Sequence, residues 1–262
     1  MKEYLKYKIE LKTLEPLRIG ASKDVMSSFD NPVATIGGRV VVQGSTLKGF
    51  LRNQIEEYLI DKYSGIKSMK PCIPSSERTL SADEKLLIKN EKYRDKGACS
   101  YSSEDMRNKS DSICPACYFF GAMGLNGFVR IPYLYTETKP EELYSVRLDR
   151  AKGTVVEKTN RDYQIMADNV SFIGIMEIMV HNTVNNWTLG KIRDIQNNKK
   201  LDGWLNEISK KYNKRFTDLT AAELAEEFLV ERINGAHIIG GFKSKGCGKV
   251  LIKCVKIDDQ KK

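Results

Sequence analysis

A basic segment early in the chain has the residue types of a phosphate-binding helix start. Three valines form a short strand, Gln43-Gly44 ends it, and Ser45 then offers a hydroxyl to the free N–H groups of a helix. Lys48 and Arg52 are four residues apart, so both should lie on one side of that helix near its N-terminus. Free N–H groups, the helix dipole and two cations together favour a phosphate. A capped amphipathic helix with a solvated basic edge is the alternative.

A second basic segment, GGFKSKGCGK at residues 240–249, could also approach a phosphodiester backbone. Its four glycines permit positive φ angles and close contact with a ligand. Lys243, Lys245 and Lys249 supply charge, and Ser244 supplies a hydroxyl. The spacing is not that of a nucleotide-binding P-loop, and a strand rather than a helix should follow. A glycine-rich hairpin turn with solubilising lysines is the alternative.

Four cysteines fall within one polar region of the sequence. Cys72 and Cys99 precede Cys114 and Cys117, which have the CxxC spacing. Four thiolates in a segment with little regular structure predict a tetrahedral zinc site that holds the segment together. Disulfides are not expected in a cytosolic chain, and unlinked thiols are the alternative. Cys254, far away in the sequence, lies on the apolar face of a strand and should belong to the core.

Nothing in the sequence suggests a nucleophilic triad. The chain has only two histidines, His181 and His237, so nucleolytic chemistry would need a carboxylate or a metal. Asp30, which precedes Asn31-Pro32, is the first candidate carboxylate, and Asp24 is the second. An aspartate in this position is also an ordinary turn residue.

Composition favours a globular protein with an anionic partner. The chain has 262 residues, of which 41% are hydrophobic and 29% charged, and its net charge is +9. This excess of basic residues favours RNA or DNA over a membrane surface. No apolar run approaches the about 18–20 residues of a membrane span, and the charged N-terminus does not resemble a signal peptide. The expected location is therefore the cytoplasm.

The elements that would position these residues predict an α+β fold. Leu5, Tyr7, Ile9 and Leu11 alternate with charged residues, which indicates a strand buried on one face. In chain order the pattern is β-α-β-β-α-β, the split βαβ arrangement of ferredoxin-like and RNA-recognition folds. Such a sheet has helices on one face and leaves the other free. After the first strand, the elements are expected at residues 45–63, 128–134, 170–180, 201–212, from 220 onward and at 249–257.

Some of these segments carry more detailed expectations. Residues 128–134 are interrupted by Pro132, which predicts an edge strand, whereas residues 170–180 are apolar on both faces and should be central. Thr220 and Glu223 have the spacing of a capping box. Residues 64–113 read as an irregular insertion, and the charged residues 136–169 suit a projecting hairpin.

Taken together, these segments resemble the RAMP superfamily, and above all the repeated backbone subunit of type III CRISPR–Cas effector complexes. The resemblance extends over nearly the whole chain. Gln43 departs from it, because a proline is common before the Gly-Ser pair. The motifs follow the order seen in that family: IG at 19–20, DNPV at 30–33, GSTLKGFLR at 44–52, CPACYFFG at 114–121, VRLDR at 146–150 and GGFKSKGCGKV at 240–250.

The resemblance implies a single domain over residues 1–262, with a modified ferredoxin-like, RRM-like core. It places a lid at residues 64–120 and a thumb-like hairpin at 136–169, and it implies copies that form a filament along the guide RNA. Some relatives carry zinc in the inserted region, which supports zinc at the four cysteines. Guide-RNA contacts are expected at Ser45, Thr46, Lys48, Arg52, Arg147, Arg150, Gly241, Lys243, Ser244 and Lys245.

The activity implied is cleavage of guide-complementary target RNA, with Asp30 as the catalytic residue and a divalent ion such as Mg²⁺. The expected partners are guide RNA, target RNA, further copies of the chain and other subunits of the complex, but no membrane. Two alternatives stay open. One is an inert guide-binding subunit, and the other is a single-chain RNA-processing endonuclease of the same superfamily. The latter usually has a histidine or a tyrosine–lysine set near its N-terminus, and none is evident here.

Overall fold

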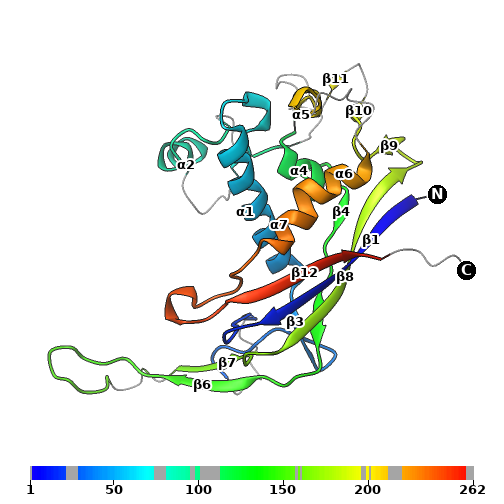
Figure 1. The fold of residues 1–262 in the computed structure, drawn as a ribbon. Coiled ribbons are helices and arrows are strands. Elements are labelled where there is room, and N and C mark those ends of the chain that lie inside the picture. Colours follow the sequence, from blue (N-terminus) through cyan, green and yellow to red (C-terminus); the bar gives the residue numbers. More distant parts are fainter. Residues whose placement is uncertain are drawn as a thin grey trace, which may run out of the picture.

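One antiparallel sheet forms the centre of the molecule, and the longer helices cover one of its faces (Figure 1). The computed structural model describes residues 2–21, 29–73, 81–94, 98–100, 113–156, 159, 161–195, 199–200, 202–211 and 220–257. Within these residues the main sheet has eight strands. Their order is β12-β1-β8-β5-β3-β2, and β4 and β9 also pair with β8. The α+β class is therefore confirmed.

The first strand, β1 (Lys2–Thr13), shows the predicted alternation. Tyr7, Ile9 and Leu11 are buried, whereas the alternating Lys6, Lys8 and Lys12 are exposed. Side chains alternate across a strand, so the apolar set faces the helices and the lysines face away. This strand lies between β8 (Ser171–Asn182) and β12 (Val250–Lys256) and is antiparallel to both.

Helix α1 (Gly44–Tyr63) packs its apolar stripe against the sheet. Leu47, Leu51 and Ile55 are fully buried at a spacing of four residues. The helix begins earlier than predicted: Gln43 is the N-cap and makes no side-chain capping bond, so Ser45 lies inside the first turn. The amide of Leu47 donates to the Gln43 carbonyl, which starts the helical ladder there.

A second helical stretch lies beside α1 on the same face of the sheet and consists of three consecutive segments (Figure 1). Thr220 and Glu223 form the predicted capping box at its start. Phe228 and Ile233 are buried against the core. Together with α1, this stretch gives two βαβ units that share one sheet. The segments are α6 (Ala221–Ala225), the π-helical turn η3 (Glu226–Val230) and α7 (Glu231–Asn234).

The strand predicted at residues 128–134 is split in two. β4 (Val129–Arg130) and β5 (Leu134–Thr136) both pair with β8, and Pro132 lies between them, where no ladder bond is required. A Cβ on Gly174 of β8 would come within 2.6 Å of the Tyr133 carbonyl oxygen. Glycine at position 174 thus lets the connecting segment cross closely over β8.

The prediction that this strand lies at the edge of the sheet holds for β4, which pairs only with β8 among the described residues, but it is wrong for β5. β3 (Arg39–Val42) pairs with β5, and β2 (Thr35–Ile36) pairs with β3. This two-stranded hairpin precedes α1 in the sequence and extends the sheet past β5. Only long-range pairing places it there, and a local sequence pattern does not carry that information.

β8 is central in the sheet, as predicted, but it is not buried on both faces. Phe172, Met176 and Ile178 are buried against the helices, whereas Ile173 and Ile175 on the opposite face are about half exposed. Leu251 and Val255 of β12 are exposed as well. The open face of the sheet therefore carries apolar side chains among the lysines of β1.

The region predicted as a lid, residues 64–120, ends in a helix that belongs to the core. Helix α4 (Pro115–Phe120) is buried at every position. Tyr118 packs edge-on against Trp204 of α5 (Trp204–Lys211), and its hydroxyl accepts from the Gly190 amide. The described part of this region also contains η1 (Lys67–Met69) and α2 (Ala82–Ile88).

A fully buried ion pair anchors the far end of this core. The guanidinium of Arg193 donates two hydrogen bonds of 2.8 Å to the carboxylate of Asp202, and neither side chain is exposed. It also lies over the rings of Tyr118 and Phe128. Removing either partner of such a pair would be strongly destabilising, because the other would remain as a buried uncompensated charge.

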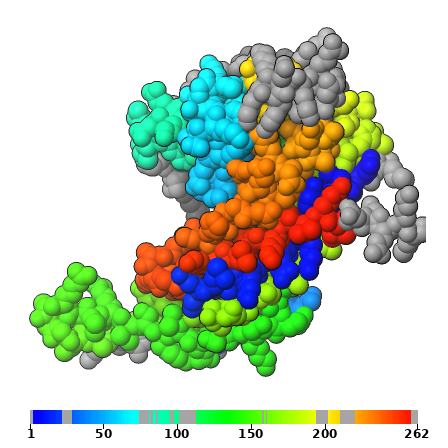
Figure 2. Space-filling view, in the orientation of Figure 1, coloured from blue at the N-terminus to red at the C-terminus, as the bar shows by residue number. Residues whose placement is uncertain are grey.

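A long hairpin projects from the body (Figures 1 and 2). β6 (Glu141–Ser145) pairs antiparallel with β7 (Arg161–Ile165), and the connecting residues continue outward. In the part of the chain that is described, no helix is long and apolar enough to span a membrane. The remaining short elements are β9 (Trp187–Thr188), β10 (Asp194–Ile195), β11 (Lys199–Lys200) and η4 (Lys243–Lys245).

Candidate nucleic-acid groove and metal centre

A groove of about 760 Å³ brings together segments that are far apart in the sequence. One wall is the first half of α1, from Thr46 to Glu57, and the other is the loop that leads into η4. Arg18 and Gly20 close one end. Of the predicted RNA-binding residues, Thr46, Gly241 and Lys243 line this groove. Ser45, Lys48, Ser244 and Lys245 are exposed but do not line it.

The start of α1 leaves backbone donors available to a ligand. Its first turn contains no acidic residue and has no side-chain cap. Gly44 lets this turn pack closely on the segment between β4 and β5, since a Cβ there would come within 3.1 Å of the Ile131 and Pro132 carbonyl oxygens. Free N–H groups at the positive end of a 20-residue helix favour an anion.

The glycine-rich loop is held by backbone contacts to the segment before Asp30. The Gly241 amide donates to the Arg18 carbonyl at 2.9 Å. Gly240 has a φ of +89°, and a Cβ on it would come within 2.6 Å of the same oxygen. Only glycine combines that φ angle with that close approach. The loop then turns at Phe242, which itself adopts the left-handed conformation, and presents Lys243 to the groove.

Asp30 lies in an exposed loop fixed at the base of the hairpin. The next residue, Asn31, pairs with β7: its amide donates to the Asp162 carbonyl, and its carbonyl accepts from the Gln164 amide. The Asn31 side-chain oxygen accepts from Arg18 at 3.3 Å. The Asp30 backbone therefore adjoins both the hairpin and the groove. Asp24, the second candidate, lies outside the described residues.

Arg18 links these three segments. Its guanidinium is 5.0 Å from the ring centre of Tyr163 in β7 and 4.9 Å from that of Phe242 in the glycine-rich loop. Sequence reasoning gave Arg18 no role. The only local signal is a single basic residue between the buried Leu17 and Ile19, and its partners come from distant parts of the chain.

Arg147 and Arg150 lie elsewhere, beyond the paired strands of the hairpin. Both are exposed, and the chain turns around them through the bridge between Leu148 and Val155. The carboxylate of Asp149 accepts from the next amides in this turn. Neither arginine is among the residues that line the groove.

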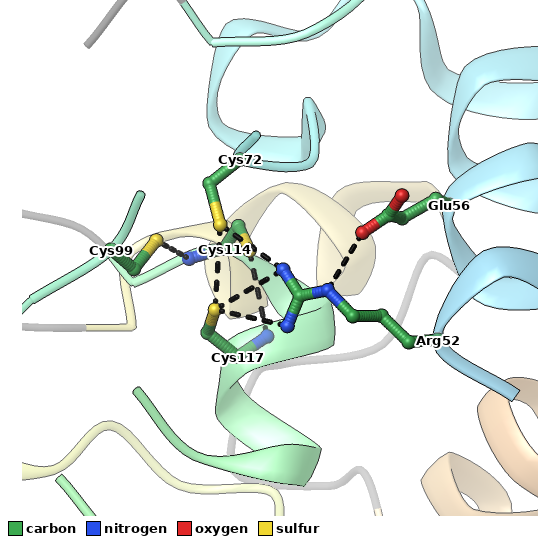
Figure 3. Close-up of polar contacts among 6 residues, drawn as sticks. All are labelled: Arg52, Glu56, Cys72, Cys99, Cys114 and Cys117. Carbon is green, nitrogen blue, oxygen red and sulfur yellow. Dashed lines mark hydrogen bonds and ion pairs between the residues drawn. The ribbon is translucent and has the colours of Figure 1, made fainter. Parts of the chain in front are cut away.

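The four predicted cysteines converge from distant parts of the sequence. Cys114 is the N-cap of α4, and Cys117 lies in its first turn. Their sulfur atoms and those of Cys72 and Cys99 all lie within 4.8 Å of one another, and the Cys72 and Cys117 sulfurs are 3.5 Å apart (Figure 3). All four are free thiols.

This donor set fits a zinc ion. Tetrahedral coordination with Zn–S bonds of about 2.3 Å puts the sulfurs about 3.8 Å apart, which is close to the observed spacing. Four sulfur ligands favour zinc over the harder Mg²⁺. The four cysteines could therefore bind zinc. Among the residues that the structure describes, no other group of three or more histidine, cysteine or carboxylate side chains has such a spacing.

The structure places Arg52 differently from the prediction. It does not line the groove but points to the cysteines, with its Nη2 atom 3.1 Å from the Cys72 sulfur (Figure 3). Its Nε atom donates to the buried Glu56 carboxylate at 2.8 Å. Lys48, one turn earlier, stays exposed. Two residues four apart share a helix face only approximately, and the long Arg52 side chain reaches round to the neighbouring sulfurs.

Charges are balanced locally around the cysteines. Burial would lower the pKa of Arg52, but the sulfurs of Cys117, Cys72 and Cys114 raise it above its usual value. Burial likewise would raise the pKa of the Cys114 thiol, whereas hydrogen bonds from the other thiols and the charge of Arg94 hold it well below its usual range. The site therefore favours at least one thiolate, which is the form that binds metal.

One protein family matches most of the chain. The model of the RAMP superfamily matches residues 10–251, which is most of the chain. The chain belongs to the RAMP superfamily. Membership in the RAMP superfamily implies binding of CRISPR RNA, and the antiparallel sheet with helices on one face is consistent with its ferredoxin-like fold. No individual curated protein matches the chain.

Proposed function

We propose that this RAMP protein is a guide-RNA-binding backbone subunit of a type III CRISPR effector complex, and that Asp30 takes part in cleavage of the paired target RNA. The observation that carries the proposal is the groove, in which the start of α1, the glycine-rich loop and Arg18 meet. Backbone donors, the exposed Lys243 and a close glycine approach suit a phosphodiester chain without reading its sequence.

The position of Asp30 supports a role next to, rather than within, the guide groove. Its loop is tied to the projecting hairpin through Asn31 and to the groove through Arg18. A hairpin at this point could separate bases of the guide–target duplex and expose the target backbone near Asp30. The filament of copies and the other subunits of the complex follow from the resemblance alone.

The proposed cleavage asks little of the protein beyond positioning. A 2′-hydroxyl of the target could attack the adjacent phosphate if the complex holds it in line. The P–O2′ bond would form as the P–O5′ bond breaks, which gives a 2′,3′-cyclic phosphate. The 2′-hydroxyl would lose its proton to solvent, and the 5′-oxygen would leave as a hydroxyl after taking a proton from solvent. Mg²⁺ is commonly bound by one or two carboxylates together with substrate phosphates and water, so Asp30 would be a sufficient protein ligand. The bound ion would neutralise charge that develops on the phosphate. Asp30 would hold the ion beside the bond that breaks.

Asp30→Ala in the assembled complex tests this proposal. Loss of a ligand to the catalytic ion should lower target cleavage about a thousandfold, equivalent to about 4 kcal/mol, and leave guide and target binding nearly unchanged. Asp61→Ala is the matched control, because Asp61 is an exposed carboxylate on α1 beyond the groove. Full cleavage by the Asp30 variant would favour the inert subunit.

Co-purifying RNA separates the remaining alternative. A backbone subunit should elute as an assembly with several copies along one guide, and the bound RNA should contain repeat-derived sequence. A processing endonuclease should elute as a single chain that cleaves precursor RNA without a guide.

We also propose one structural zinc per chain, bound by Cys72, Cys99, Cys114 and Cys117. Elemental analysis of protein purified without chelator should find one equivalent. Cys114→Ser with Cys117→Ser should abolish it, whereas Cys247→Ser, which changes a buried cysteine outside the cluster, should not. Zinc that persists in the double variant would contradict the assignment.

A further inference from the structure

Arg52 makes contacts that a simple helix ion pair does not need. Its Nε atom donates to Glu56, four residues later, at 2.8 Å. The two remaining nitrogens turn away from Glu56 and face sulfur: Nη2 is 3.1 Å from the Cys72 sulfur, and both Nη atoms are 3.6 Å from the Cys117 sulfur (Figure 3). The planar guanidinium thus bridges one carboxylate and two sulfurs.

The charge of a zinc–tetrathiolate centre makes these contacts chemically useful. Four thiolates and one Zn²⁺ ion carry two net negative charges, and three of the four cysteines are buried. Such a charge is costly in a poorly solvated site unless donors and cations lie close to it. Hydrogen bonds from an arginine are charge-assisted, and its rigid fork fixes the position of both acceptors.

We infer that Arg52 is an outer-sphere partner of the cysteine centre, which holds the sulfurs of Cys72 and Cys117 in place for the metal, and that Glu56 in turn orients Arg52. This inference rests on the zinc site proposed above. It gives Arg52 a role in metal retention in place of phosphate binding. Residues of this kind position ligands and balance charge without touching the ion.

The inference also explains why Glu56 is buried. A carboxylate with only 7% side-chain exposure would be costly without a partner. Burial raises the pKa of Glu56, and the charge of Arg52 opposes that shift. In this position Glu56 limits the rotation of Arg52 and directs its Nη atoms to the sulfurs.

Metal affinity provides a direct test. Arg52→Gln should weaken zinc binding about 10–100-fold, measured by competition with a chromophoric chelator, because outer-sphere partners of metal ligands commonly contribute that much. Arg52→Lys should rescue only part of the loss, since an ammonium cannot form the same fork. Lys48→Gln is the matched control: it removes one cation from the same helix, at an exposed position, and should leave affinity unchanged.

Two further measurements keep the test decisive. Arg52→Gln leaves the buried Glu56 without its arginine partner, so Arg52→Gln combined with Glu56→Gln serves as a neutral variant that should fold and still lose affinity. Protein loaded with Co²⁺ should show a shifted sulfur-to-cobalt charge-transfer band in both variants, because N–H···S bonds withdraw electron density from sulfur. Wild-type affinity and an unshifted band in the neutral variant would overturn the role of Arg52.

The outcomes separate this inference from the zinc proposal. If the wild-type chain takes up neither Zn²⁺ nor Co²⁺, the metal site itself is refuted, and the role of Arg52 is refuted with it. If the wild type binds metal and all Arg52 variants bind it equally well, the metal site stands and only the role of Arg52 is refuted.

Discussion

The lysines of η4 offer the most direct test of the groove. Lys243 lines the groove, and Lys245 lies two residues further along the same exposed turn. Neither makes an ion pair within the described part of the chain, although Lys245 lies over the ring of Phe242. If both neutralise RNA phosphates, replacing them with alanine should change how strongly binding depends on salt.

The size of this change follows from counterion release. Each phosphate contact with a single strand contributes about 0.7 to the slope of log K against log salt, so two lost contacts should reduce the slope by about 1.4. Between about 50 and 200 mM salt, the wild type should therefore lose about sevenfold more affinity than the double variant. Both lysines are exposed, so their removal should change the free energy of unfolding by no more than about 0.5 kcal/mol.

Fluorescence anisotropy with a labelled single-stranded RNA measures this slope over a salt series. The matched control is Lys6→Ala with Lys12→Ala, which removes the same charge from the open face of β1, on the other side of the sheet from the helices. A wild-type slope in the Lys243/Lys245 variant would refute the groove. An equal loss in the control would show that net charge alone attracts RNA.

Three other perturbations test the site and the core. Gly240→Ala should weaken RNA binding and cost at least about 1–2 kcal/mol in urea denaturation, because alanine at a φ of +89° is strained and its Cβ would clash with the Arg18 carbonyl; unchanged RNA affinity would show that the loop is not a binding element. Asp202→Ala should cost about 3–5 kcal/mol, since it leaves Arg193 buried without a counter-charge; denaturation by urea measures this cost, and a value below about 1 kcal/mol would contradict the buried pair. A strong chelator should lower the melting temperature of the wild type, and a Cys114→Ser variant should show no further decrease; equal melting temperatures with and without chelator would argue against structural zinc.

Local patterns predicted the elements that depend on neighbouring residues. The period of two in β1 places Tyr7, Ile9 and Leu11 on one face, and the structure buries all three. The spacing of Thr220 and Glu223 predicts a capping box because its two hydrogen bonds join residues within one turn. These signals need no knowledge of the rest of the fold.

The cysteine cluster shows that residue types alone can sometimes predict contacts between residues that are far apart in the sequence. Cys72 and Cys117 are 45 residues apart, yet their sulfurs are 3.5 Å from each other. The prediction that the four cysteines come together is confirmed, and it was possible because few other arrangements use four thiols in one polar region. It required only residue types, and no knowledge of the path between them.

The directions of long side chains could not be predicted in the same way. Arg52 and Lys48 are nearly equivalent in sequence terms, since both are basic and lie on one helix. Their surroundings differ because α4 and the segment around Cys72 pack beside α1 at Arg52. Of the two, only Arg52 therefore contacts sulfur. Arg18 is a similar case, because only the tertiary fold brings the distant residues Tyr163 and Phe242 next to it.

Helix α1 joins the two candidate sites physically. Its Thr46 and Phe50 line the groove, whereas Arg52 and Glu56 line a smaller cavity of about 380 Å³ with α2, and Gly49 and Asn53 border both. A shift of this helix at one cavity would therefore also change the other cavity. Zinc at the cysteines would fix α4 and the Cys72 segment, and Arg52 would fix α1 against them. The metal centre proposed above would then hold the groove wall in place.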